Sequence, residues 1–156
     1  MRIFGRRLSR RKADLLQPPP ASVAGAGWYV FEDLAELALE DATAIERMTP
    51  DQRLVYALNL VRQEVASGGF EGYFDWTNAS SVDSALAGFE LLAPRMGGIL
   101  QRALDLAQLH DEPDFDSLDA EFSLAETQLM VDSLVDDYVF EHSASFFASP
   151  ISRRTS

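Results

Sequence analysis

Apolar residues recur at helical spacing along most of this chain. Residues 32–47 are rich in helix formers, and the next apolar series falls on one helical face, at Leu54, Leu58, Val61 and Val65. Thr49-Pro50-Asp51-Gln52 predicts the start of that second helix, because it offers a threonine N-cap, a proline at the first position and a glutamine three residues after the cap. Ser67-Gly68-Gly69 is expected to end it, since glycine takes left-handed conformations at little cost.

The rest of the pattern is helical as well. It predicts a short aromatic helix at Phe70–Trp76, and longer helices at Val82–Leu92 and Pro94–Leu109. An acidic loop is expected at 110–117, and Ser123 with Glu126 forms a capping-box pattern before a last helix over 124–141. No alternating strand pattern of useful length appears. The sequence therefore predicts an all-α, single-domain helical bundle of about five to six helices.

Both ends of the chain read as tails. Residues 1–27 contain a basic cluster, then Pro18-Pro19-Pro20, which favours an extended spacer and cannot continue a helix. Residues 150–156 form a second short basic segment. The acidic domain is accordingly placed at 28–149, beginning near Trp28.

Charge changes this picture most, because it is sorted along the chain. The net charge is −12, yet six of the 13 basic residues lie within the first twelve positions. Residues 28–149 hold 24 acidic and 5 basic residues, which gives −19, and no Lys or Arg occurs between Arg102 and Arg153. A compact body of that charge repels nucleic acid and attracts basic surfaces over long range.

Several functional classes are disfavoured. The chain has no cysteine, and His110 and His142 lack a ligand spacing, so no metal site, cofactor or catalytic residue is predicted. A calcium-binding EF-hand loop that starts at Glu112 is excluded, because Ser117 and Ser123 occupy the positions where such a loop requires Gly and Glu. No apolar run is long enough for a membrane span, and the N-terminal region lacks a secretory apolar core, so a cytoplasmic location is expected.

One segment carries a family resemblance. Ser67-Gly68-Gly69-Phe70 is followed by Tyr73-Phe74 and then by Asn78. This pattern resembles the DNA mimic protein family, in which a helix ends in Asn-Gly-Gly-Phe before paired aromatics and an Asn. The resemblance covers about residues 50–147. Ser67 replaces the first Asn of the motif, and since both side chains bond to local backbone, the turn is expected to form.

The resemblance implies a function as well as a fold. It implies an acidic, all-helical protein, often a homodimer, whose carboxylates imitate DNA phosphates and occupy the DNA-binding face of a transcription factor. The partner would be a basic protein surface, and the body itself would not bind nucleic acid.

The spacing of the acidic residues is compatible with mimicry. Duplex DNA carries one charge per about 1.7 Å of axis. Carboxylates four residues apart on a helix lie about 6 Å apart on one face and so form a regular row of negative charges. Such spacing, without basic neighbours in sequence, recurs on the 32–41 helix, in the 111–121 segment and on the 132–141 helix. The predicted partner-binding residues are Glu32, Glu36, Glu40, Asp111, Asp114, Asp116, Asp132, Asp136 and Asp137.

Three alternatives remain open at this point. The protein could be an immunity or adaptor protein that binds a toxin or another enzyme by shape, with an exposed apolar patch beside the acids. It could be a small-molecule enzyme with a pocket that gathers Glu64, Glu71, Tyr73 and Asn78, where Arg62 could pair with one of the two glutamates. The acidity could also serve solubility alone. A separate question concerns the basic N-terminal arm, which could fold back on the acidic body and compete with a partner, could touch lipid or nucleic acid, or could be inert.

Overall fold

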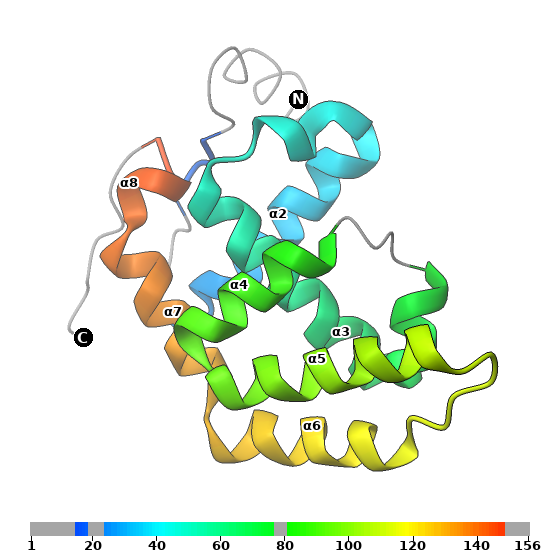
Figure 1. The fold of residues 1–156 in the computed structure, drawn as a ribbon. Coiled ribbons are helices and arrows are strands. Elements are labelled where there is room, and N and C mark those ends of the chain that lie inside the picture. The colour runs from blue at the N-terminus through cyan, green and yellow to red at the C-terminus, as the bar shows by residue number, and fades with distance from the viewer. Residues whose placement is uncertain (1–14, 19–23, 77–80, 149–156) are drawn as a thin grey trace. The chain divides into compact units, whose positions relative to one another are not determined.

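The computed structural model describes residues 15–18, 24–76 and 81–148 (Figure 1). These residues are all-α, as the sequence predicted, and no β-strand occurs among them. They form two compact units: one comprises the described residues up to Tyr56 together with those from Val135 onward, and the other comprises Ala57–Leu134. Helices α3 (Pro50–Trp76) and α7 (Val131–Glu141) each contribute residues to both units.

The first helix of the first unit differs from the one that the sequence predicted. Residues 32–47 are not one helix, because α2 (Ala26–Glu40) starts earlier and is followed by the 3-10 helix η1 (Ala42–Arg47). Asp41 separates the two in an extended conformation, and its Oδ1 accepts a hydrogen bond from Thr43 N at 2.9 Å. A short polar side chain that caps the following turn competes with helix continuation. Its hydrogen bonds from Thr43 and Arg47 lower the pKa of Asp41.

The predicted capping box at the start of α3 is confirmed. Thr49 N donates to Gln52 Oε1 at 2.9 Å, and Gln52 N donates to Thr49 Oγ1 at 3.1 Å. The same two side chains reach α8 (Ser143–Phe146): Thr49 Oγ1 donates to Ser145 O, and Gln52 Nε2 donates to Phe146 O. The capping box therefore satisfies backbone N–H groups at the start of α3, and its two side chains also bind α8.

The folded part of the chain begins upstream of Trp28. Leu16, in the segment predicted to be a tail, is 4% exposed. Its N–H donates to Phe146 O at 2.8 Å, and its carbonyl accepts from Ala148 N at 2.7 Å, which makes a parallel bridge. Tyr29 Oη also donates to Gln17 O. Residues 15–18 therefore belong to the first unit.

The second unit contains the predicted helices α4 (Val82–Leu92) and α5 (Pro94–Leu109), both confirmed, with α6 (Asp116–Gln128) packed along α5 (Figure 1). Gly97 allows α5 to approach α4, since a Cβ at that position would lie 3.3 Å from Phe89 Cβ. The absence of a side chain at Gly97 thus permits close contact between the two helices.

The predicted last helix over 124–141 is wrong. Its sequence is divided between α6 and α7, and Ser123 lies inside α6 instead of capping a new helix. Leu118, Phe122 and Ala125 are buried at helical spacing, which explains why α6 starts in the predicted acidic loop. The break falls at Met130, whose φ of 52° lies in the left-handed region. Nothing in its side chain predicts such a conformation.

Candidate functional site

The segment that carries the family resemblance interrupts α3. Gly69 has φ 66° and ψ −175°, a region that essentially only glycine occupies. Helical geometry therefore breaks where the sequence predicted, and the short aromatic helix follows the break. Ser67 Oγ donates to Glu64 O at 3.3 Å, which confirms the local backbone bond expected of serine at this position.

Asp119 on α6 occupies the space beside this break. Its Oδ1 accepts from Phe70 N at 2.9 Å and so caps the helical segment that follows. A Cβ added to Gly69 would lie 2.5 Å from Asp119 Oδ2. The carboxylate of Asp119 thus occupies the space that a side chain at position 69 would need.

The aromatic residues of the motif join a ring cluster. Phe70 and Tyr73 are fully buried, as expected of core aromatics. Phe70 meets Phe122 edge-on at 5.2 Å between ring centroids, and burial raises the pKa of Tyr73. Phe74 is half-buried and packs against Phe115 at 5.7 Å. Asn78 lies outside the described residues.

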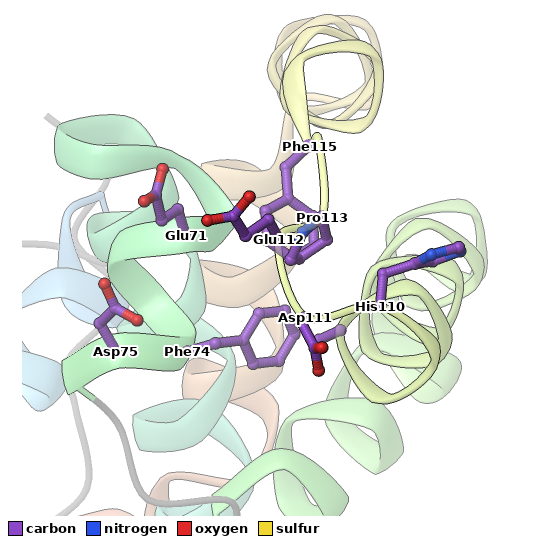
Figure 2. Close-up of a pocket in the computed structure, with 9 residues that line it drawn as sticks. Glu71, Phe74, Asp75, His110, Asp111, Glu112, Pro113 and Phe115 are labelled. Atoms are coloured by element: carbon purple, nitrogen blue, oxygen red, sulfur yellow. The ribbon is translucent and has the colours of Figure 1, made fainter.

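A cavity of about 450 Å³ opens beside this cluster (Figure 2). Its inner wall is apolar and comes from α3, α5 and the loop before α6: Phe74, Ala107, Pro113 and Phe115. Exposed carboxylates surround it: Glu71, Asp75, Asp111 and Glu112. His110 completes the lining, and its side chain points away from Phe74.

This cavity differs from the pocket that the sequence suggested. Of the four residues named for that pocket, Glu71 lines the cavity, whereas Tyr73 is core and Glu64 is not part of the lining. The cavity brings together two segments about forty residues apart, and periodicity cannot pair such segments. One signal was available in the sequence, since Phe115 is an isolated aromatic within an acidic stretch.

Arg62 pairs with other residues than predicted. Instead of Glu64 or Glu71, its guanidinium binds both carboxylate oxygens of Glu126 at 2.7 and 2.5 Å, and Asp132 at 2.5 Å. Its Nη1 also donates to Asn59 Oδ1. Burial alone would lower the pKa of Arg62, but the hydrogen bonds to the two carboxylates outweigh it and raise this pKa.

Asp132 and Asp136, two of the nine predicted partner-binding carboxylates, make hydrogen bonds to residues far away in the sequence. Asp132 is held by Arg62, as described above. Asp136 caps the start of α2, because its two oxygens accept from Gly25 N at 2.9 Å and Gly27 N at 2.7 Å. Its spacing from Asp132 is helical, but neither carboxylate is directed only toward solvent.

The other seven lie in two groups. In the first unit, Glu32, Glu36 and Glu40 follow one another at four-residue intervals within α2, and Asp137 is exposed on α7. In the second unit, Asp111 and Asp114 lie before α6 and Asp116 is its first residue. Asp114 Oδ1 accepts from Asp116 N at 3.0 Å, so this carboxylate also orders the turn.

All five arginines between residues 28 and 148 are engaged within the chain. Arg47, Arg62 and Arg102 form ion pairs with carboxylates. Arg53 donates to the carbonyls of Ile45 and Glu46, and Arg95 to Gln128 Oε1. The acidic partners in these ion pairs are Asp41, Glu121, Glu126 and Asp132.

Metal-ligating side chains do not cluster in the described part of the chain. No group of three or more His, Cys, Asp or Glu residues there has a geometry that could hold a metal ion. His142 stacks on Tyr138 at 4.1 Å, and its Nδ1 lies 3.0 Å from Tyr138 O, near the C-terminal end of α7. No helix over the described ranges is both long and apolar enough to cross a membrane.

Comparisons with known proteins give one match. A family model described as DMP19-like protein matches residues 46–142, which is more than half of the chain. Curated protein sequences and solved structures gave no significant match. The matched range contains the Gly69 break, the ring cluster and the cavity.

Proposed function

The chain belongs to the family of DMP19-like proteins, and from that premise we propose that it binds the basic face of a DNA-binding protein. In this proposal its carboxylates stand where DNA would present phosphates, and the function is binding rather than catalysis. The family is one of DNA mimic-like proteins, and the identity of the partner is the part that has to be tested.

The observation that supports this proposal best is that the arginines of the body are bound within the chain. A typical acidic surface is interspersed with basic residues that neutralise it locally. Here the five arginines of the body are all bound within the chain, and they stand against 24 acidic residues, which leaves the body with a net charge of −19. The large negative field of the body therefore remains available to steer a basic partner.

The structure also indicates which carboxylates to test. Glu32, Asp111 and Asp137 are exposed, and their side chains take part in no hydrogen bond or ion pair within the described residues. Asp132 and Asp136, by contrast, hold the fold together, so their substitution would mix stability with binding. The first three therefore provide the cleanest test of electrostatic recognition.

We expect capture from the source lysate to be strongly salt-dependent. The protein should retain a DNA-binding protein at low salt, release it at about 0.5 M salt, where the Debye length falls to about 4 Å, and release it when duplex DNA is added. The triple change Glu32→Gln, Asp111→Asn and Asp137→Asn should weaken binding about tenfold, at about 0.5 kcal/mol for each charge.

The matched control changes three other exposed carboxylates. Glu46→Gln, Asp83→Asn and Glu90→Gln remove the same charge from positions outside the proposed set. Equal weakening by both triples would mean that total charge, and no particular surface, governs association. A partner that DNA does not displace would contradict mimicry.

A second candidate function rests on two exposed apolar side chains of the first unit. Leu39 on α2 is 90% exposed beside Glu40, and Ile45 on η1 is 41% exposed. Exposed apolar residues beside acids are what an immunity or adaptor protein would use to bind a toxin or another enzyme by shape. A captured partner that survives 0.5 M salt but is lost with Leu39→Ser would favour this function.

Removal of the basic arm should strengthen partner binding. Residues 1–14 carry six basic residues and one acidic residue, and a tethered cation competes at high effective concentration. Because Leu16 is buried in the first unit, the truncation should end at residue 14. We expect about threefold to tenfold tighter binding at low salt, measured by calorimetry. Unchanged or weaker binding would contradict competition by the arm.

A further inference from the structure

The cavity in the second unit has a shape and charge that match one kind of side chain. We infer that it receives an arginine side chain of the basic partner, stacked on Phe74 and paired with the surrounding carboxylates. This inference rests on the proposed function, because it assigns part of the partner's contact to one place.

The aromatic floor is held in position before any ligand arrives. The ring of Phe74 lies 5.1 Å from Tyr73, 6.2 Å from Phe70 and 5.7 Å from Phe115, measured between centroids. Phe70 and Tyr73 are fully buried, and Phe115 is 6% exposed, so these three rings fix the fourth. Phe74 itself remains half-buried and lines the cavity. A guanidinium plane can stack on such a ring with little loss of side-chain freedom in the protein.

The charge of the cavity selects a cation. Glu71 and Asp75 come from α3, and Asp111 and Glu112 from the loop before α6, and all four are exposed. Glu71, Asp111 and Glu112 line the same cavity as Phe74 (Figure 2). No hydrogen bond or ion pair links any of these four side chains to another described residue. Acidic residues occur throughout this chain, and these four differ from the others because an aromatic floor lies between them.

No arginine of the same unit fills the cavity. Arg62 is bound to Glu126 and Asp132, Arg102 to Glu121, and Arg95 to Gln128. The volume of about 450 Å³ is ample for one long side chain. A bare metal ion fits less well, because no group of three metal-ligating side chains was found within the described residues. Arginine is preferred over lysine, because its flat guanidinium both stacks and pairs with two carboxylates.

The test needs no partner protein. N-acetyl-arginine amide is titrated into the whole chain while backbone amide resonances are followed by NMR. We expect saturable shifts confined to residues 71–75 and 107–115. N-acetyl-citrulline amide has the same shape without the charge, and it should bind about tenfold more weakly or not at all.

Three variants separate the contributions of the carboxylates and of the Phe74 ring to arginine binding. The double change Asp111→Asn with Glu112→Gln should weaken arginine binding about tenfold, whereas Asp83→Asn with Glu90→Gln removes the same charge outside the cavity and should leave it unchanged. Phe74→Leu retains all four carboxylates and should weaken binding about threefold to tenfold. Its amide spectrum first establishes that the variant is folded.

Each outcome decides the matter. Equal binding of citrulline, shifts spread over the whole acidic surface, or undiminished binding by folded Phe74→Leu would overturn the inference and leave only a diffuse acidic surface. If the arginine probe binds as expected but no DNA-binding protein is captured, the cavity assignment stands and the proposed function fails. If a DNA-displaceable partner is captured but the arginine probe does not bind, the proposed function stands and the cavity assignment fails.

Discussion

Gly69→Ala is expected to lower the free energy of unfolding by about 2 to 4 kcal/mol. The backbone at this position has φ 66° and ψ −175°, and a residue with a Cβ is strained there by about 1 to 3 kcal/mol. The new Cβ would also lie 2.5 Å from Asp119 Oδ2, so that carboxylate must move away. Phe70 N would then lose its acceptor, which costs about 1 to 3 kcal/mol for a partly buried donor.

Gly68 provides the matched control for this experiment. It is the preceding glycine of the same motif, and a Cβ there would meet nothing within 4 Å. Gly68→Ala should therefore be neutral or stabilising by about 0.5 to 1 kcal/mol, as for glycine in an exposed helix interior. Urea unfolding followed by circular dichroism measures both variants. Equal effects of the two substitutions would contradict the role given to Gly69.

A double-mutant cycle separates the two contributions at Gly69. Asp119→Ala removes the carboxylate that the new Cβ would meet, but it leaves the backbone strain in place. If the collision matters, Gly69→Ala should cost less in the Asp119→Ala background than in the original protein. Full additivity would mean that backbone strain alone explains the loss.

The sequence predicts those parts of the fold that depend on residues close together along the chain. Helices over 82–92 and 94–109 and the capping box at Thr49 and Gln52 are local features, and the structure confirms them. The break at Met130 is different, because a left-handed methionine has no local signature and its side chain is 67% exposed. Backbone hydrogen bonds hold the turn instead: Met130 N donates to Thr127 O at 3.3 Å, and Met130 O accepts from Ser133 N at 3.0 Å. The missed break is why α6 and α7 were joined into one predicted helix.

The candidate site was harder to predict than the fold. A four-residue spacing puts carboxylates on one helical face, but it cannot tell which of them the protein uses internally. Asp136 binds the amides of Gly25 and Gly27, more than a hundred residues away in sequence. The cavity likewise joins Phe74 to Phe115 across about forty residues. The motif was found from sequence, whereas its part in building the floor of a cavity depends on these distant contacts.

Arg62→Met is expected to cost about 3 kcal/mol of unfolding free energy. The side chain of Arg62 is 4% exposed and binds Glu126 through two hydrogen bonds and Asp132 through a third. Removing one member of a buried ion pair typically costs about 3 to 5 kcal/mol. The lower end applies, because Glu126 and Asp132 are 30% and 64% exposed and can be partly solvated once the guanidinium is gone.

Arg102→Met is the matched substitution for this prediction. Arg102 also binds a glutamate through two hydrogen bonds, to Glu121 at 2.8 Å each, but its side chain is 55% exposed. Its loss should therefore cost much less than the loss of Arg62, because an exposed ion pair is screened by solvent. Chemical unfolding at low and high salt measures both, and the Arg62 effect should persist at high salt because buried pairs are weakly screened. Similar costs for the two arginines would contradict a buried structural role for Arg62, and Asp132 would then return to the carboxylates available for a partner.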